Sequence, residues 1–247
     1  MAAAPSPLLL LSATEFEVEP LAGAFEPADE VSAALPAGWR ARRGALEGVP
    51  TVAVATGVGK VNAATLTALA VAALKPSALL LVGIGGAYPG AGLVTGEAAF
   101  ALSETHVDTG VGHGASWQGL ESIGFPLLPT TGAGSAPVYN RLPLAPGSAP
   151  LAKRLGLSAV PFATSEAVTA DAATARLLRS LHGVAVESME GAAVAQVAAA
   201  LQVPLYQVRG VSNLVGDRDK TNWRVHDAVA AGCRAARAAV PLLSEAL

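Results

Sequence analysis

Apolar residues gather along the chain in short, almost continuous runs that are separated by alanine-rich stretches. Runs such as residues 8–13 and 77–84 are typical of strands buried on both faces of a parallel sheet. The stretches between them have the length of helices. Strands and helices that alternate over the whole chain predict an α/β fold, with residues 1–247 forming a single doubly wound domain. We expect further strands at 37–46, 51–56, 96–103, 160–164, 182–186 and 204–212, and helices at 63–74, 170–181 (N-capped by Asp171), 187–201 and from Thr221 or Asn222 to Leu243.

The bulk composition is that of a globular protein with a large core. Of the 247 residues, 52% are apolar and only 14% are charged. The net charge is −3 and the basic residues are scattered, so no nucleic-acid surface is expected. No run approaches the roughly 20 apolar residues of a membrane span, so no membrane association is expected. The lone Cys233 excludes an intrachain disulfide and fits a reducing cytoplasm, where we expect the protein to act.

Neither a metal nor a cofactor is expected from the motifs. His106 and His113 lack the spacing of metal ligands. The glycine-rich residues 57–62 have neither the spacing of a phosphate loop nor the dinucleotide-binding pattern. We interpret them as a tight turn between a strand and a helix, in which Lys60 caps the helix or pairs locally. The long irregular segment 104–150 is expected to be a functional loop or a subunit contact.

Polar side chains follow several of the predicted strands. Glu15 and Glu17 come directly after the first strand, Glu190 follows the strand that ends at residue 186, and Asn213 and Asp217 follow the last strand. Because ligands of α/β proteins bind beyond the carboxyl ends of the strands, these side chains are expected to meet at one edge of the sheet.

Each of these side chains also has a plain structural explanation. Glu190 would be favourable as a first-turn acid of the helix that follows it, and Asn213 suits a turn. Taken together, however, two carboxylates and an amide without a metal set or a cysteine nucleophile suit hydrolysis of a glycosidic bond. A serine–histidine–aspartate triad is harder to assemble, because the chain contains no Gly-x-Ser-x-Gly elbow.

Four segments, in the right order along the chain, resemble the nucleoside phosphorylase/nucleosidase superfamily. They are the loop with Glu15 and Glu17, residues 57–64 (Gly-Val-Gly-Lys-Val-Asn-Ala-Ala), residues 189–193 (Met-Glu-Gly-Ala-Ala) and residues 208–213 (Val-Arg-Gly-Val-Ser-Asn). Residues 83–88 and 212–219 further resemble the futalosine hydrolase family. The resemblance implies a three-layer domain with a mixed central sheet flanked by helices, a small nucleoside as substrate and a homo-oligomer.

The resemblance also implies roles for individual residues. Glu17 corresponds to the acid that activates the attacking water, Met189 to the residue that packs on the ribose face, and Glu190 to the acceptor of the 2′- and 3′-hydroxyl groups. The remaining positions assigned to the base and its loop are Gly85, Gly86, Val168 and Asp217. The glycines permit close approach to a ligand or to neighbouring chain. Val168 falls near a phenylalanine of the adenine nucleosidases, so Phe162 or Trp223 is expected to stack on the base.

Asn213 departs from the adenine-specific nucleosidases, which carry an aspartate beside the purine N7. A 6-oxopurine presents O6 and N7 as two acceptors on one edge, and an asparagine NH₂ group can donate to them while an ionised aspartate cannot. An unsatisfied buried pair would cost about 1–3 kcal/mol. We therefore predict hypoxanthine as the leaving base, with either Asn213 or Asp217 handling the purine proton.

Water is predicted as the nucleophile, rather than phosphate. The phosphorylases of the superfamily have arginine and serine where this chain has Leu81 and Ile84, and apolar side chains cannot bind a phosphate dianion. The alternatives are a methylthioadenosine/S-adenosylhomocysteine nucleosidase and an inosine-type phosphorylase. The resemblance implies futalosine as the substrate, and its 5′ benzoate would need a cationic or N–H-rich partner, for which Arg141, Lys153 and Arg218 are equal candidates at this point.

Overall fold

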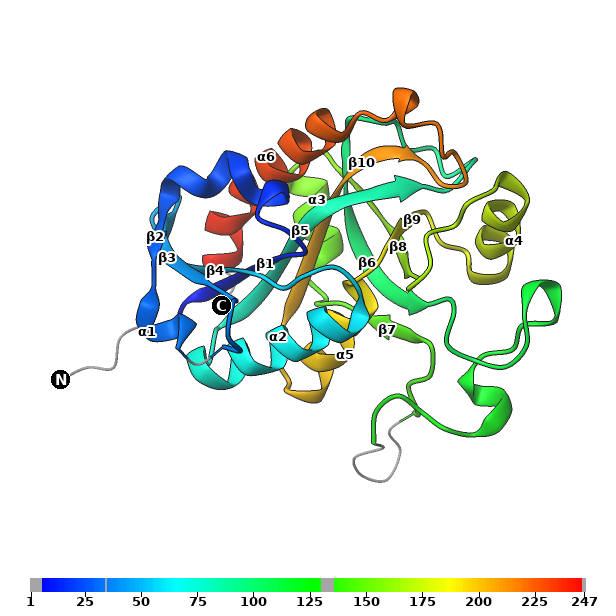
Figure 1. Cartoon of the computed structure of the whole chain (residues 1–247), viewed down its shortest axis with the longest axis horizontal. Coiled ribbons are helices and arrows are strands. Elements are labelled where there is room, and N and C mark those ends of the chain that lie inside the picture. Colours follow the sequence, from blue (N-terminus) through cyan, green and yellow to red (C-terminus); the bar gives the residue numbers. More distant parts are fainter. Residues whose placement is uncertain (1–5, 34, 130–135, 246–247) are drawn as a thin grey trace.

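The structure, a computed structural model, describes residues 6–33, 35–129 and 136–245. Its strands and helices alternate along the chain, as the apolar runs predict (Figure 1). In chain order the elements are β1 (Leu8–Ser12), the 3₁₀ helix η1 (Phe16–Ala24), β2 (Phe25–Pro27), α1 (Asp29–Ser32), β3 (Ala41–Leu46), β4 (Val49–Ala55), α2 (Lys60–Leu74), β5 (Ala78–Ala87), β6 (Ala98–His106), η2 (Gly114–Ser116), η3 (Leu120–Ile123), β7 (Arg141–Pro143), α3 (Ser148–Arg154), β8 (Ser158–Thr164), α4 (Ala172–His182), β9 (Val186–Ser188), α5 (Gly191–Ala200), β10 (Leu205–Leu214), η4 (Lys220–Asn222) and α6 (Val225–Ser244).

The strands of the described residues form one mixed, ten-stranded sheet in the order β10-β6-β8-β9-β5-β1-β4-β3-β2, with β7 paired to β6. The central strand β1 runs parallel to both β4 and β5. In contrast, β3 runs antiparallel to β4, and β9 runs antiparallel to β5. A further parallel pairing of β10 with β5 closes β5, β10, β6, β8 and β9 into a ring. The arrowheads of β5 and β10 point the same way in Figure 1, so their carboxyl ends lie together.

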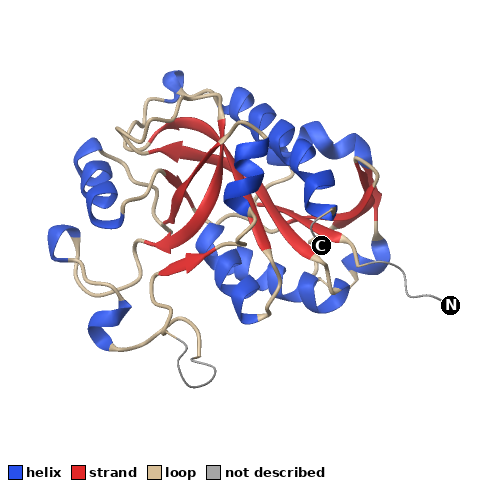
Figure 2. Cartoon of the chain, turned by 180° about the vertical axis from the view of Figure 1, so that it is seen from behind, coloured by secondary structure: helices blue, strands red, loops and turns tan. Residues whose placement is uncertain are grey.

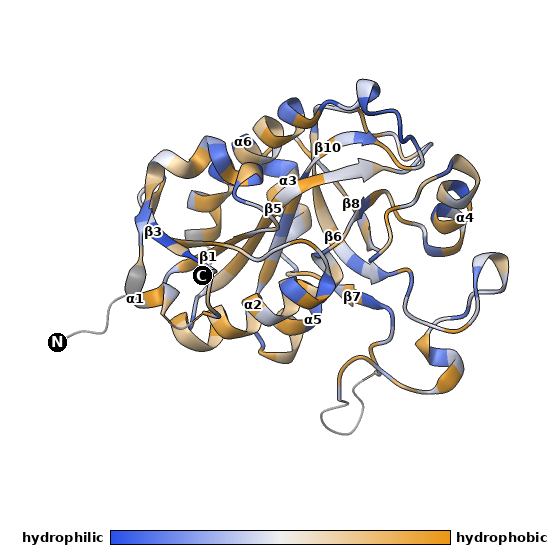
Figure 3. Ribbon diagram, in the orientation of Figure 1, coloured by the Kyte–Doolittle hydropathy of each residue, from blue (hydrophilic) through white to orange (hydrophobic). Residues whose placement is uncertain are grey.

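Two apolar cores lie on opposite faces of the sheet, and β1 contributes to both. Successive side chains of a strand point to opposite faces, so Leu9 and Leu11 pack into one core and Leu8 and Leu10 into the other. The first core includes residues of α2 and α5, and the second includes residues of α6. Figure 2 shows helices covering the sheet from behind as well, and Figure 3 shows the apolar residues concentrated on the central elements. This arrangement confirms the predicted three layers.

The element boundaries confirm most of the predicted strands and helices and correct two of them. Asp171 caps α4 as expected, accepting hydrogen bonds from the backbone N–H groups of residues 173 and 174. The strand expected at 182–186 lies later in the chain, as β9 at Val186–Ser188. The polar residues after Val186 are buried and paired with β8, so the strand includes them. Thr221 and Asn222 lie in η4, and the last helix begins at Val225 with Arg224 at its N-cap position.

The segment 104–150 has more regular structure than its composition suggests. Its first residues continue β6, and β7 and α3 lie in its second half, while residues 130–135 are outside the described residues. Within the part of the chain that the structure describes, no helix is long and apolar enough to cross a membrane.

Candidate active site

A cavity of about 400 Å³ lies beyond the carboxyl ends of the strands, where the sheet topology predicts a ligand site. Residues that follow β1, β4, β8 and β9 line it, together with the last residues of β5 and β10. The cavity brings together most of the side chains singled out in the sequence: Glu17, Gly85, Gly86, Val168, Met189, Glu190 and Asn213. A second cavity of about 370 Å³ beneath η1 is lined by none of these residues.

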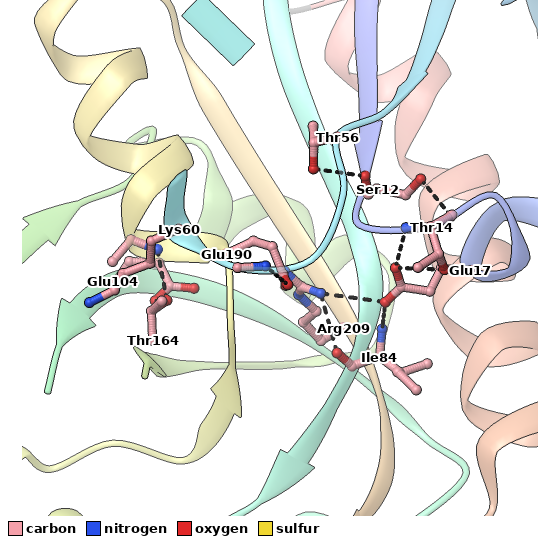
Figure 4. Close-up of polar contacts among 12 residues, drawn as sticks. Ser12, Thr14, Glu17, Thr56, Lys60, Ile84, Glu104, Thr164, Glu190 and Arg209 are labelled. Atoms are coloured by element: carbon pink, nitrogen blue, oxygen red, sulfur yellow. Dashed lines mark hydrogen bonds and ion pairs between the residues drawn. The ribbon is translucent and has the colours of Figure 1, made fainter. Parts of the chain in front are cut away.

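Arg209 does not line the cavity itself but joins Glu17 and Glu190 from behind its wall, and we call these three residues the floor (Figure 4). Its Nη2 atom lies 3.2 Å from Oε2 of Glu190, and its Nη1 atom lies 3.7 Å from Oε1 of Glu17. The guanidinium group is fully buried, and Nη1 also donates to the carbonyl oxygen of Ile84 at 3.2 Å. Gly83 makes room for this contact, because a Cβ atom there would lie 2.3 Å from Nη1 of Arg209. Acids far apart in the sequence therefore share one cation.

Glu17 is held by the tight turn that leads from β1 into η1. Its Oε2 atom accepts hydrogen bonds from the backbone N–H of Thr14 at 3.0 Å and from the Thr14 hydroxyl at 3.3 Å. Its Oε1 atom accepts from the backbone N–H of Ile84 on β5 at 2.9 Å. Donors from the turn after β1 and from β5 thus fix the orientation of a buried carboxylate at the cavity wall.

Glu190 occupies the N-cap position of α5, and its carboxylate reaches across to the start of α2. Its Oε1 atom accepts from the backbone N–H of Gly59 at 3.1 Å. Gly59 has a φ of +91°, a conformation that a side chain would strain. The glycine-rich turn therefore directs its N–H toward an internal carboxylate, which agrees with its interpretation as a tight turn.

Asn213 lies at the irregularity in the pairing of β10 with β5, beside Gly86. Its Oδ1 atom accepts a hydrogen bond from the Ser212 hydroxyl at 2.7 Å, and its Nδ2 atom donates to the carbonyl oxygen of Leu214 at 2.9 Å. Because an amide nitrogen carries two protons, one N–H of Asn213 is left for a ligand in the cavity.

Comparisons with known proteins agree with this geometry. Residues 7–247 match the sequence profile of the Phosphorylase superfamily. The chain is 38% identical over 230 residues to a futalosine hydrolase of Thermus thermophilus, covering 93% of each chain. It is 34% identical over 249 residues to a futalosine hydrolase of Streptomyces coelicolor, covering 96% of each.

The chain belongs to the phosphorylase superfamily and, within it, to the futalosine hydrolase family. In fold it is also similar to the methylthioadenosine/S-adenosylhomocysteine nucleosidase of Neisseria meningitidis in complex with methylthio-immucillin-A. The TM-score of that comparison is 0.77 at 20% identity, with 95% of this chain and 98% of that chain covered. At this identity the likeness concerns the fold alone.

The loop after β10 carries the remaining residues that were expected in the site of this futalosine hydrolase family member. Asp217 is not part of the cavity lining. Its carboxylate accepts hydrogen bonds from Nδ2 of Asn222 at 3.0 Å and from the backbone N–H of Asp219 at 2.9 Å. Its carbonyl oxygen accepts from Nε1 of Trp223 at 3.1 Å. Asp217 therefore shapes the loop, and the loop brings Arg218, Lys220 and Trp223 to the cavity.

The structure distinguishes the three candidates for binding a substrate carboxylate. Only Arg218 lines the cavity, and its guanidinium carbon lies 5.0 Å from the centre of the Trp223 ring. Arg141 donates to the carbonyl oxygen of His182, and Lys153 is exposed on α3. Of the two residues expected to stack on the base, Phe162 is buried within β8 and only Trp223 lines the cavity.

Sequence reasoning missed two buried charged residues of the site. Arg209 lies inside an apolar run, and a charged residue in such a run was the available signal. Glu187 lines the cavity and accepts hydrogen bonds from the Tyr88 hydroxyl at 2.8 Å and from the Thr169 hydroxyl at 2.6 Å. Burial, followed by the charge of Glu187, raises the pKa of Tyr88 far above its ordinary value. Tyr88 therefore stays protonated and donates to Glu187.

The expectation that Lys60 caps a helix or pairs locally is wrong. Its Nζ atom forms an ion pair at 2.7 Å with Asp108, which follows β6, and its backbone N–H donates to Glu166 at 3.0 Å. Asp108 in turn accepts from the backbone N–H of Glu166 at 2.7 Å. These contacts join the start of α2 to the loop between β8 and α4, beside the cavity.

Proposed function

We propose that the chain hydrolyses the N-glycosidic bond of futalosine, releasing hypoxanthine and dehypoxanthine futalosine in the futalosine route to menaquinone. The observation that carries the proposal is that two buried carboxylates, Glu17 and Glu190, line a single cavity and pair with the same guanidinium. Membership of the futalosine hydrolase family supports this substrate. No cofactor takes part in the proposed reaction.

The positions of the two acids suit a dissociative cleavage. Glu190 accepts from the ribose hydroxyl groups, with Met189 packed on the sugar face, and Glu17 accepts a proton from the water that attacks C1′. As the bond to the base lengthens, the sugar acquires positive charge. Preorganised carboxylates stabilise this charge without having to reorient, because Glu17 and Glu190 are already held by backbone N–H groups.

Selection of a 6-oxopurine is assigned to Asn213. Its amide oxygen accepts from Ser212, and one amide N–H is bound by a carbonyl, so the second N–H can donate to O6 or N7 of hypoxanthine. An adenine base would present its amino group to this donor. The repulsion between two donors favours hypoxanthine as the leaving base.

Water rather than phosphate is supported as the nucleophile. Leu81 is fully buried in the sheet and Ile84 presents an aliphatic side chain to the cavity, so neither offers a donor to a phosphate dianion. Arg209 lies behind the cavity wall and is already paired with two carboxylates, and Arg218, which lines the cavity, lies in the loop after β10.

The 5′ benzoate of futalosine is assigned to the rim formed by Arg218, Lys220 and Trp223. All three line the cavity, and both cations are exposed, so a carboxylate there would remain partly hydrated while its ring packs on Trp223.

We also propose that the protein acts as a homo-oligomer in the cytoplasm. Val61 on α2 is 75% exposed and Phe125 is 69% exposed, which is unusual for large apolar side chains. An apolar groove of about 450 Å³ lies beside Val61, between α2, α5 and residues 127–129. Sedimentation of the purified protein tests this, and a monomer at micromolar concentration would contradict it.

One experiment separates the proposed reaction from its alternatives. The protein is mixed with futalosine, inosine and methylthioadenosine, each with and without phosphate, and the released base is identified. We expect hypoxanthine from futalosine at a rate that is independent of phosphate. Adenine from methylthioadenosine as the fastest reaction would favour the adenine nucleosidase, and a strict requirement for phosphate would favour a phosphorylase.

A further inference from the structure

Glu104 is a third buried carboxylate beside the site, and the proposed reaction does not use it directly. It lies on β6, is 0% exposed and does not line the cavity. Its Oε2 atom accepts a hydrogen bond from the Thr164 hydroxyl at 2.9 Å, while its Oε1 atom has no hydrogen-bond partner among the described residues. Burial raises the pKa of Glu104 from its ordinary value of 4.5 to about 7.

The carboxylate of Glu104 lies against the start of α5, the helix that carries Glu190 at its N-cap position. A Cβ atom on Gly191 would lie 1.7 Å from Oε1 of Glu104, so the absence of a side chain at residue 191 makes room for this oxygen. The Thr164 hydroxyl that donates to Glu104 (Figure 4) also accepts from the backbone N–H of Ala192 at 2.8 Å. Free N–H groups at a helix start favour a negative charge nearby.

The charges that act on Glu104 come from the active site itself. The positive charge of Arg209 on β10 favours its ionised form, and the negative charge of Glu190 opposes it. Its neutral neighbours are Thr164 on β8 and Gln207 on β10. Tyr88, which follows β5, responds to the charge of Glu104 as well. His106 is also on β6, but the charges acting on it are those of Lys60 and Asp108.

An acid with only a structural role would be energetically unfavourable at this buried position. The ionised form is disfavoured by burial, and a glutamine of the same shape could accept from Thr164 without that cost. Gln207 shows that a neutral amide is tolerated in this environment, since it is fully buried. The negative charge of Glu104 is therefore expected to have a role in the reaction.

We infer that Glu104 is a positioning residue that holds the start of α5, and with it Glu190, and that its charge strengthens the negative field behind the ribose. This inference rests on the proposed cleavage of a ribosyl bond. A more negative field favours the positively charged sugar of the transition state. The ionised form of Glu104 is then the active form, so kcat rises as the pH increases through the pKa of this residue.

The experiment compares the pH dependence of kcat for futalosine in the wild-type protein and in Glu104→Gln. The wild-type kcat is expected to rise with a midpoint near pH 7, and Glu104→Gln is expected to lack this rise, with kcat at pH 8 about tenfold lower. A variant that keeps both the rise and the wild-type kcat would overturn the inference. Failure of the proposed function appears differently, because the wild-type protein would then release no base from futalosine at any pH.

Thr164→Val is the second variant, and it keeps the acid. The Thr164 hydroxyl favours the ionised form of Glu104, so its removal is expected to move the rise in kcat to higher pH. A purely structural role would lower stability but leave the midpoint unchanged, and that result would also contradict the inference. The two variants thus give different profiles, one without the rise and one with a displaced rise.

Thermal unfolding controls for the fold of these variants. The folded wild-type protein keeps the proton of Glu104 between pH 4.5 and about 7, where the unfolded chain releases it. The stability contributed by the protonated form is therefore present below pH 4.5 and is lost as the pH rises through about 7. Glu104→Gln lacks this loss, so its melting temperature relative to the wild type should increase over the same range.

Discussion

The floor and the rim of the cavity are built in opposite ways. On the floor, Arg209, Glu17 and Glu190 are buried and connect segments that are far apart in the chain. On the rim, Arg218 and Lys220 are exposed, and the loop that carries them is held mainly by its own acids, Asp217 and Asp219. Changes on the floor should therefore affect catalysis and folding together, whereas changes on the rim should affect substrate choice alone.

The largest effect is expected on the floor, for Glu17→Gln. The amide cannot take a proton from water, so kcat should fall by about a thousandfold or more, while the affinity for hypoxanthine stays within about twofold. The measurement is a steady-state assay with futalosine, together with calorimetric binding of the base.

Glu15→Gln is the matched control for that variant. Glu15 is exposed two residues before Glu17, and its nearest cation is Arg42 at 3.6 Å. Its kcat should be that of the wild type. A Glu17→Gln variant that retains a near-normal rate would remove Glu17 from the mechanism.

Stability should respond most strongly to Arg209→Gln, because the change leaves two buried carboxylates without their cation. Breaking a buried ion pair in this way costs about 3–5 kcal/mol of unfolding free energy. The contrasting variant is Arg224→Gln, whose ion pair with Asp227 is shorter, at 2.7 Å, but exposed. Its loss should cost less than about 1 kcal/mol. Equal shifts of the two variants in urea unfolding would contradict the distinction between the buried ion pairs of the floor and an exposed one.

The sequence predicted the convergence of Glu17 and Glu190 because the loops that follow the carboxyl ends of strands in an α/β sheet gather at one edge and form the ligand site. It did not predict Arg209, whose partners come from η1 and from the N-cap of α5, and whose orientation depends on the strand register. The pairing of Lys60 with Asp108 was missed for the same reason, since no local pattern reports a contact between residues 48 positions apart. Asp217 lies near Asn213 in sequence, yet its carboxylate is used within its own loop.

A smaller effect is expected for Asn213→Asp. Asn213 lines the cavity but belongs to neither the floor nor the rim. The new carboxylate oxygen would face the carbonyl oxygen of Leu214, and it would offer no donor to O6 or N7 of hypoxanthine. The value of kcat/KM for futalosine should fall about tenfold, the lower range of the cost of an unsatisfied polar group. Methylthioadenosine serves as the internal comparison, and an equal loss for both substrates would show that Asn213 does not select the base.

The smallest effect is expected on the rim, for Arg218→Ala. An exposed charge-assisted hydrogen bond to a carboxylate contributes little, so KM for futalosine should rise about three- to tenfold with kcat unchanged. Inosine, which lacks the benzoate, should react as it does with the wild type, and so should futalosine with Lys153→Ala, which removes an exposed charge on α3. If inosine and futalosine lose activity equally, Arg218 contacts the purine or the ribose instead. The rim would then belong to the catalytic machinery, and the separation of substrate choice from catalysis would not hold for this cavity.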